Sequence, residues 1–396
     1  MPVGRSFARM KKKYPWRLSL FIIAYYVTNA CYQGFIPKYY EQMGISKQQL
    51  PILMAGTPLV AIFFQPAWGI IGDRAKTRNR VLYLMTACSA ALILLYRVSD
   101  SFWWLLPISC LFAACYTSIQ PIGDSIVLES LLAQEQPFGP TRLTGCLSFA
   151  VMSVVFGIVL EARLQWTVYL TFGMLIVTFL SVRSLPETQG HQSSGRKMNL
   201  FALLKQRELM GLLALLTLLQ LTMGYFYSFF PVHFTELPGG TNALLGWCFF
   251  ISAVSEVPFL IKSDALFDKL GAGRLMLLSA LVCTARWVLL ASTNSIVAAM
   301  AGQMLHGWGF IVITVSMAKY INLTVPNELK ASGQMLLAVV GFGIARVFGV
   351  LGGGLLAEAM GGVRQGFWLM SAISGVTLCA FAPIYLRRPA LNGRRG

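Results

Sequence analysis

Charged residues are scarce in this sequence. They make up 12% of its 396 residues, where a soluble domain carries about 25%, while hydrophobic residues reach 56% and the mean hydropathy is +0.64. This composition excludes a soluble enzyme and a disordered chain. The basic residues stand in short blocks between apolar runs, so the net charge of +17 does not indicate a surface that binds nucleic acid. The sequence predicts a polytopic membrane protein.

Motifs for metal, phosphate or covalent chemistry are also missing. Histidine occurs three times, and the eight cysteines all fall inside predicted spans without a Cys-x-x-Cys pair. The sequence contains no HExxH, GxSxG or Walker motif, and its glycine clusters lack the Lys-Ser/Thr that completes a phosphate loop. We therefore expect no enzymatic activity, no metal, no cofactor and no ATP-driven step.

Long apolar runs repeat along the whole chain. One helical span takes about 20 apolar residues, and with a connection each unit takes roughly 33, which predicts twelve spans. We expect them near residues 17–39, 49–72, 81–96, 102–130, 141–161, 166–183, 209–231, 244–262, 275–292, 296–318, 332–357 and 366–386. The predicted fold class is an all-α membrane protein with twelve transmembrane helices.

The distribution of lysine and arginine predicts the orientation of these spans. With the N-terminus inside the cell, cytoplasmic segments hold 24 of the 32 Lys and Arg residues, and external loops hold five. The apolar run after the basic N-terminal block exceeds 20 residues, which is too long for the apolar core of a signal peptide. We predict a multi-pass protein of the plasma membrane with both termini in the cytoplasm.

The chain divides near its midpoint. Residues 184–208 form its longest polar stretch, with the composition of a linker. Residues 69–74 at the end of the second span are echoed by residues 264–269 at the end of the eighth, with aspartates 195 residues apart. This duplication predicts two pseudo-symmetric six-helix bundles, 1–183 and 209–396, joined by a cytoplasmic linker at 184–208.

Residues 65–74, with Arg80, have the form Gln-Pro-x-x-Gly-x-x-x-Asp-Arg followed by a second arginine. This segment resembles the signature loop of the major facilitator superfamily, in the form found in the lactose permease and its relatives. The resemblance implies two six-helix bundles with a substrate site between them near the midplane. It also implies that Gly69, Asp73, Arg74 and Arg80 act on conformational switching and do not touch substrate.

Three further segments extend the resemblance over nearly the whole chain. Asp124 and Arg142, 18 residues apart, resemble that permease's paired acid and arginine, with Asp in place of Glu. Arg286 and the segment Gln303-Met-Leu-His306 match an arginine of the ninth span and a histidine of the tenth. The Gln-x-Leu-His form is closer to the phenylpropionate-permease-like branch.

The pair Asp124 and Arg142 is the predicted substrate site of the N-terminal half. A charge at the bilayer centre costs about 2.5–3.5 kcal/mol on insertion scales. A charged residue therefore occurs there only where it pairs with another group, faces a water-filled cavity or has a function. A planar guanidinium suits bidentate binding to a carboxylate or to sugar hydroxyls, although Arg142 could instead anchor the cytoplasmic end of its helix. Tyr25 and Gln33 in the first span are further substrate candidates, against the alternative of packing.

Glu256 and Arg286 have matching depths in the eighth and ninth spans, which predicts a salt bridge across two helices. The bridge either holds the bundle together permanently or opens when a proton or substrate arrives. Where the resemblance would supply an acid in the tenth span, this chain has Gly309. We therefore expect Glu256 to carry a coupled proton, with Arg286 and His306 setting its affinity.

Gln303 shares a helix face with His306 at the spacing i, i+3 and is a candidate for substrate contact. Arg346 has no counterpart in the resemblance. It either faces the cavity and binds an anion or neutralises an acid structurally.

These features predict a secondary active transporter that works by alternating access. The expected activity is proton-coupled symport of a small polar or anionic organic solute, of the sugar, nucleoside or aromatic acid class. Its partners are the solute, protons and the lipid bilayer, and the expected state is a monomer. Proton-driven drug efflux and a non-transporting membrane sensor remain alternatives, although acids and arginines in both halves favour a polar substrate.

Overall fold

The computed structural model describes residues 14–136, 138–189, 203, 205–326 and 329–387. The regular secondary structure of these residues is helical throughout, with no strand among them. The N-terminal half contains α2 (Trp16–Gln42), α3 (Leu50–Arg74), α4 (Arg78–Leu94) with the short η1 (Leu95–Arg97), α5 (Phe102–Ala133), α6 (Phe138–Ala162), and α7 (Trp166–Ser181) with η2 (Val182–Ser184). The predicted linker at 184–208 lies largely outside the described residues.

The C-terminal half contains more interrupted helices. They are α9 (Arg207–Glu236), α10 (Asn242–Ser292), α11 (Ile296–Gly302), η3 (Gln303–Leu305), α12 (His306–Thr324), α13 (Lys330–Leu336), η5 (Leu337–Ile344), α14 (Ala345–Ala359) and α15 (Val363–Leu386). The tenth predicted span therefore runs through α11, η3 and α12. The eleventh runs through α13, η5 and α14, and η5 is a π-helix, a rare form that frequently occurs at functional sites.

The 51-residue α10 doubles back on itself. Gly271 inside it has φ of 73°, a left-handed conformation that glycine adopts without steric cost. Glu256 and Arg286 would be about 45 Å apart on a straight helix at 1.5 Å per residue, yet both contact His306. The run therefore makes two passes and contains the spans predicted at 244–262 and 275–292. The polar loop expected between them is reduced to a turn at one glycine.

Ten helices of the described chain are long and apolar enough to cross a membrane, with α10 counted once. The second pass of α10 and the 27-residue α2 raise the number of crossings to twelve, the number predicted. α2 is less apolar than the other ten helices, because polar residues such as Asn29 and Gln33 interrupt its apolar sequence.

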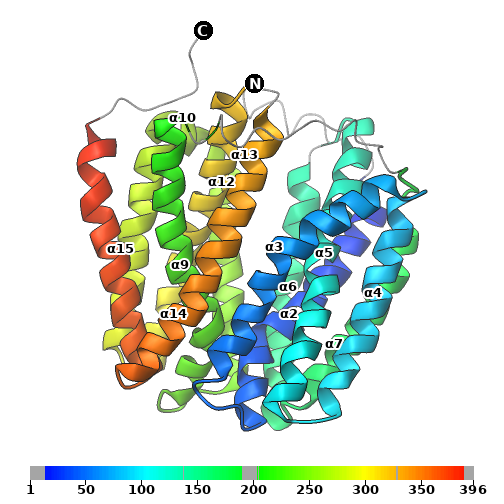
Figure 1. The fold of residues 1–396 in the computed structure, drawn as a ribbon, viewed down its shortest axis with the longest axis horizontal. Helices are drawn as coiled ribbons and strands as arrows, with labels where there is room; N and C mark the ends of the chain where they lie inside the picture. Colours follow the sequence, from blue (N-terminus) through cyan, green and yellow to red (C-terminus); the bar gives the residue numbers. More distant parts are fainter. Residues whose placement is uncertain (1–13, 137, 190–202, 204, 327–328, 388–396) are drawn as a thin grey trace.

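The helices of each half pack mainly against one another. In the N-terminal half α2 packs against α6 and α7, and α3 against α5; in the C-terminal half α10 packs against α12 and α15, and α9 against α14. Figure 1 shows the two groups side by side, with the N- and C-termini at the same end. The halves meet where α6 contacts α10, α3 contacts α14 and α2 contacts α9.

Candidate functional site

The predicted pair in the N-terminal half is present. Asp124 on α5 lies 3.2 Å from Arg142 on α6, measured from Oδ2 to Nη1, and the two side chains are 26% and 33% exposed. The guanidinium also lies 4.9 Å from the ring centre of Tyr26 on α2, within the range of a cation–π contact. Oδ1 of Asp124 is buried and has no hydrogen-bond partner among the described residues. The pair thus keeps an unused acceptor, while its role in substrate binding stays a prediction.

The structure adds Gln120 and Tyr26 to this pair. Gln120 lies one helical turn before Asp124 on α5 and hydrogen-bonds the Tyr26 hydroxyl at 3.2 Å. When its amide is turned so that the oxygen faces Arg142, the oxygen accepts from Nη1 at 2.8 Å. The spacing i, i+4 from Asp124 was the signal that could have identified Gln120 from the sequence.

Two substrate candidates of the first span, Tyr25 and Gln33, lie on the same helix as Tyr26. Tyr25 is 3% exposed and stacks on Tyr116 in the hydrophobic core, with ring centres 5.8 Å apart. Gln33 is exposed, two helical turns beyond Tyr26 on the same helix. Neither has a described hydrogen bond to the Asp124–Arg142 pair, and their roles stay predictions.

The expected salt bridge between Glu256 and Arg286 is wrong, because His306 lies between them. Nε2 of His306 is 3.4 Å from Oε1 of Glu256, and Nδ1 is 3.0 Å from Nη1 of Arg286. Nη2 of Arg286 donates to Oε1 of Gln303, which also accepts from Ser252 at 3.2 Å. Gly307 at the start of α12 permits this approach, because a Cβ there would overlap the backbone of α10. Three spans of the sequence thus meet in one chain of hydrogen bonds.

The donors of this network fix the tautomer of His306. A guanidinium has only N–H donors, so Nδ1 of His306 must accept from Arg286 and carries no proton. The ring is therefore neutral, and its single N–H is on Nε2, facing Glu256 and the Tyr227 hydroxyl at 3.2 Å. Arg286 is fully buried, with its guanidinium 4.0 Å from the ring centre of Phe226. Arg286 is therefore connected to Glu256 by hydrogen bonds through His306.

Arg346 follows the π-helix η5 at the start of α14. Its Nε and Nη2 both donate to Oε1 of Gln220 on α9 at 3.3 Å. Its guanidinium lies 5.3 Å from the ring centres of Tyr227 and Phe342 and 5.9 Å from that of Phe310. The alternative in which Arg346 neutralises an acid is wrong, because none of its described partners is a carboxylate. Gln220 and the rings come from three separate spans, which is why sequence patterns missed the group.

The switch segment contains a residue that the sequence analysis overlooked. Asp73 pairs with Arg78 at 2.9 Å, and Arg78 also reaches Glu129 on α5 at 3.2 Å. The described ion pairs of this segment thus run through Arg78, whereas Arg74 and Arg80 make none of them. A Cβ at Gly69 would meet nothing within 4 Å.

The C-terminal half carries a related cluster, in which the charges are distributed differently. Lys319 on α12 lies 2.9 Å from Asp264 and 3.6 Å from Asp268 at the end of the first pass of α10. In both halves a single cation thus joins two carboxylates near the end of the bundle that carries the termini.

The two halves touch at the end of the bundle opposite the termini. Oε2 of Glu161 at the end of α6 accepts from the backbone N–H of Ala243 in the first turn of α10 at 3.0 Å, a favourable place for a negative charge. Gly157 of α6 lies so close to α10 that a Cβ there would be 2.6 Å from the carbonyl oxygen of Asn242. Lys47 approaches Glu236 across the halves at 3.9 Å. These contacts close that end of the bundle.

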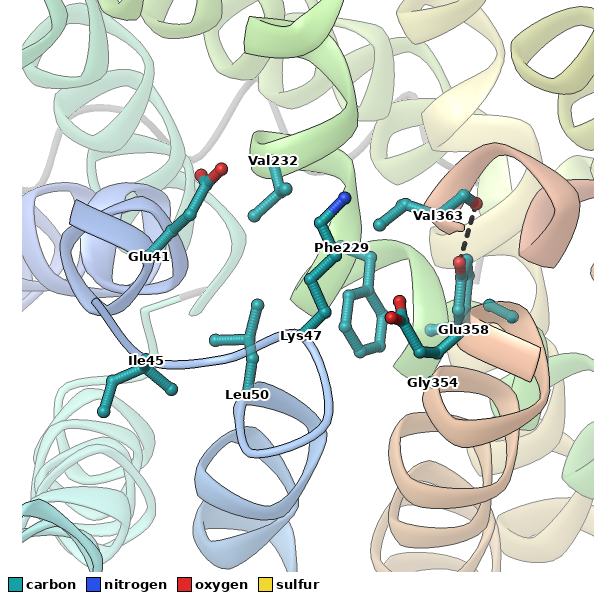
Figure 2. Close-up of a pocket in the computed structure, with 11 residues that line it drawn as sticks. Glu41, Ile45, Lys47, Leu50, Phe229, Val232, Gly354, Glu358 and Val363 are labelled. Atoms are coloured by element: carbon teal, nitrogen blue, oxygen red, sulfur yellow. Dashed lines mark hydrogen bonds between the residues drawn. The ribbon is translucent and has the colours of Figure 1, made fainter. Parts of the chain in front are cut away.

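Figure 2 shows the space left at this closed end. The pocket lies between α2, the start of α3, α9 and α14, and Lys47, Phe229 and Glu358 are among the residues that line it. Its volume of about 30 Å³ is near the share of one water molecule in the liquid. A solute cannot pass here in this conformation.

Known proteins share this architecture. The chain is 26% identical over 320 residues to the maltose permease of Geobacillus stearothermophilus, covering 80% of this chain and 81% of the permease. It is 24% identical over 371 residues to a probable 3-phenylpropionic acid transporter of Escherichia coli (strain K12), covering 90% and 94%. The crystal structure of the nucleoside transporter NupG matches its fold with a TM-score of 0.82 at 14% identity, covering 94% of this chain and 99% of that one.

The family model with the description "MFS_1 like family" matches residues 15–368. This match spans all but one of the predicted helices and agrees with the permeases and transporters above, none of which is an enzyme. The chain therefore belongs to the MFS_1 like family, and is a multi-pass membrane transporter of the major facilitator superfamily.

Proposed function

We propose that this protein is a secondary active transporter that carries a small polar or anionic organic solute together with a proton by alternating access. The relatives carry names that refer to maltose and 3-phenylpropionic acid, and the solved structure is a nucleoside transporter. We infer the same range of solutes for this chain, transport in the plasma membrane as a monomer, and a cytoplasmic position for both termini. The two bundles 1–183 and 209–396 are the moving parts.

The observation that carries the proposal is the buried network of Glu256, His306 and Arg286. Its carboxylate faces a neutral histidine whose other nitrogen is held by an arginine, so a proton on Glu256 changes the net charge of the C-terminal half without breaking a fixed ion pair. Glu256 also lies within electrostatic reach of Arg142 in the other half. A change of charge on Glu256 thus alters the electrostatic energy of residues in both bundles.

The contacts at the two ends of the bundle support the proposal of alternating access. In this conformation the end opposite the termini is closed by Glu161 against α10 and by close glycine packing between α6 and α10. The outward-open state requires these contacts to separate while the clusters around Arg78 and Lys319 bring the other end together. A proton and a solute that bind the two states with different affinity then drive the exchange.

Uptake into proteoliposomes tests the proposal. The purified protein is reconstituted, and labelled maltose, uridine and 3-phenylpropionate are offered with and without an acidic exterior. We expect one solute class to accumulate above its external concentration only when the pH gradient is present. Accumulation that is the same with and without the pH gradient would exclude proton symport. Export of cationic dyes against their own concentration gradient would favour drug efflux instead.

A further inference from the structure

The surroundings of Arg346 do not serve any step described so far. Its guanidinium lies among the rings of Tyr227 on α9, Phe310 on α12 and Phe342 on η5, at 5.3 to 5.9 Å from their centres. Each of these four side chains is partly exposed, whereas Gln220 behind them is fully buried. The group therefore places a partly exposed cation among three aromatic rings, with a buried amide behind it.

Two hydrogen-bond donors of this group remain unused. Nη1 of Arg346 has no described hydrogen bond, because Gln220 engages only Nε and Nη2. Nε2 of Gln220 belongs to the same amide that contacts the guanidinium, and it is buried without a partner among the described residues. A buried donor without an acceptor is costly, which points to an acceptor that the protein itself does not provide.

We propose that Arg346, Gln220 and Tyr227 form a subsite for the carboxylate of an organic monoanion, whose apolar body lies against Phe310 and Phe342. This inference rests on the proposed transport function and specifies its substrate class as an aromatic or similarly flat monocarboxylic acid. A planar guanidinium binds a carboxylate through two N–H groups, and the rings on either side fit a flat apolar group.

The charges of the C-terminal half support a single negative charge on the ligand. Arg286 and Arg346 are both cations without a described ion pair, and Glu256 is the one carboxylate that faces this network in the described chain. His306 is neutral by its hydrogen bonds, and Asp124 with Arg142 balance each other in the other half. The C-terminal network thus has one positive charge in excess when Glu256 is ionised, and a monoanion that binds together with one proton leaves this net charge unchanged.

Tyr227 connects this subsite to the proton site. Its ring contacts Arg346, and its hydroxyl lies 3.2 Å from Nε2 of His306, which also faces Glu256 at 3.4 Å. When Glu256 is ionised, the Nε2–H of His306 donates to its carboxylate. When Glu256 is protonated, the same N–H donates to the Tyr227 oxygen, and the Tyr227 hydroxyl donates to the carboxylate of the ligand. The proton on Glu256 and the bound anion therefore favour the same arrangement of hydrogen bonds, so that one proton binds with each anion.

Binding to the purified full-length protein in lipid nanodiscs tests the subsite. The probes are benzoate, phenylacetate and 3-phenylpropionate, each paired with its uncharged amide, and titration calorimetry gives the affinities. We expect at least one acid to bind roughly 10- to 100-fold more tightly than its amide, and Arg346→Gln to remove this preference. Arg163→Gln, at an exposed arginine in the loop before α7, is the matched control and should leave both affinities unchanged.

Two further variants keep the test decisive if Arg346→Gln does not fold. Phe342→Leu should weaken acid binding several-fold, while Phe348→Leu on an exposed face of the same span should not. Tyr227→Phe should weaken acid binding and also lose the uptake of one proton per bound anion, measured with a pH dye in weak buffer. Equal affinity for every acid and its amide, or unchanged acid binding in Arg346→Gln and Phe342→Leu, would overturn the proposal.

The outcome separates this inference from the proposed function. If maltose or uridine accumulates in proteoliposomes while no acid is preferred over its amide, the transport function stands and the anion subsite falls. If an acid binds through Arg346 but is never carried across the membrane, the subsite stands and the transport function falls.

Discussion

The close packing of α6 against α10 gives a prediction about conformational balance. Replacing Gly157 by Ala puts a Cβ 2.6 Å from the carbonyl oxygen of Asn242 and 3.1 Å from Cα of Gly246. Ordinary contact begins near 3.4 Å, so the two backbones must separate by about 0.8 Å at this point, and neither is a flexible side chain that can turn away. Overpacking of this kind costs about 1–3 kcal/mol, which lowers the population of the closed conformation roughly 5- to 150-fold relative to the outward-open one.

Pulsed electron–electron distance measurements detect this change. The spin labels replace Lys47 and Glu236 in a protein whose native cysteines have been removed. In the closed conformation Nζ of Lys47 lies 3.9 Å from Oε1 of Glu236. Gly157→Ala should convert a short distance distribution into a longer one, and Gly246→Ala should do the same, because its Cβ would overlap the Ser153 carbonyl. Gly173→Ala on α7, where a Cβ meets nothing within 4 Å, is the control. An unchanged distribution in both variants would refute the assignment of this packing to the closed state.

Three further predictions concern the charged residues and the packing of α10 on α12. Asp73→Asn should slow transport but leave the equilibrium affinity for the solute within a few fold of the wild-type value, because its ion pair with Arg78 lies near one end of the bundle and not at the predicted solute site. Loss of solute binding in folded protein would contradict this prediction. Neutralising Asp124 or Arg142 should abolish solute binding, and Arg142→Lys should not restore it if the contact is bidentate; wild-type affinity in Arg142→Ala would contradict this. Gly307→Ala should lower the free energy of unfolding by about 1–3 kcal/mol, seen as a lower Tm, while Gly352→Ala, which has open space, should not.

The sequence predicted the family and the crossings well because both depend on local patterns. Apolar runs of about 20 residues report spans whatever their neighbours are, and Asp73 stands in a motif that is contiguous in the chain. The fold-back at Gly271 was less accessible, because the charged residues around it predict a polar loop, whereas the helix continues through them to a turn at one glycine. Hydropathy alone therefore separated the two passes of α10 by a connection longer than the actual turn.

Side-chain partners across helices could be predicted only in part. Asp124 and Arg142 were paired correctly because the resemblance supplied both residues together. Matching depth suggested a bridge from Glu256 to Arg286, but depth does not give the rotation of each helix about its axis. That rotation turns His306 into the space between them. Gln220 likewise meets Arg346 across 126 residues, a relation that no periodicity encodes.

The most direct test of the proton site is Glu256→Gln in proteoliposomes, with the solute identified by the uptake panel. Gln keeps the size of the side chain and an acceptor for the Nε2–H of His306, but it cannot take up a proton. We predict that the variant loses accumulation driven by a pH gradient while it keeps exchange of labelled for unlabelled solute, which needs no net proton movement. Accumulation against the concentration gradient that survives in Glu256→Gln would contradict the account and transfer the proton to Asp124.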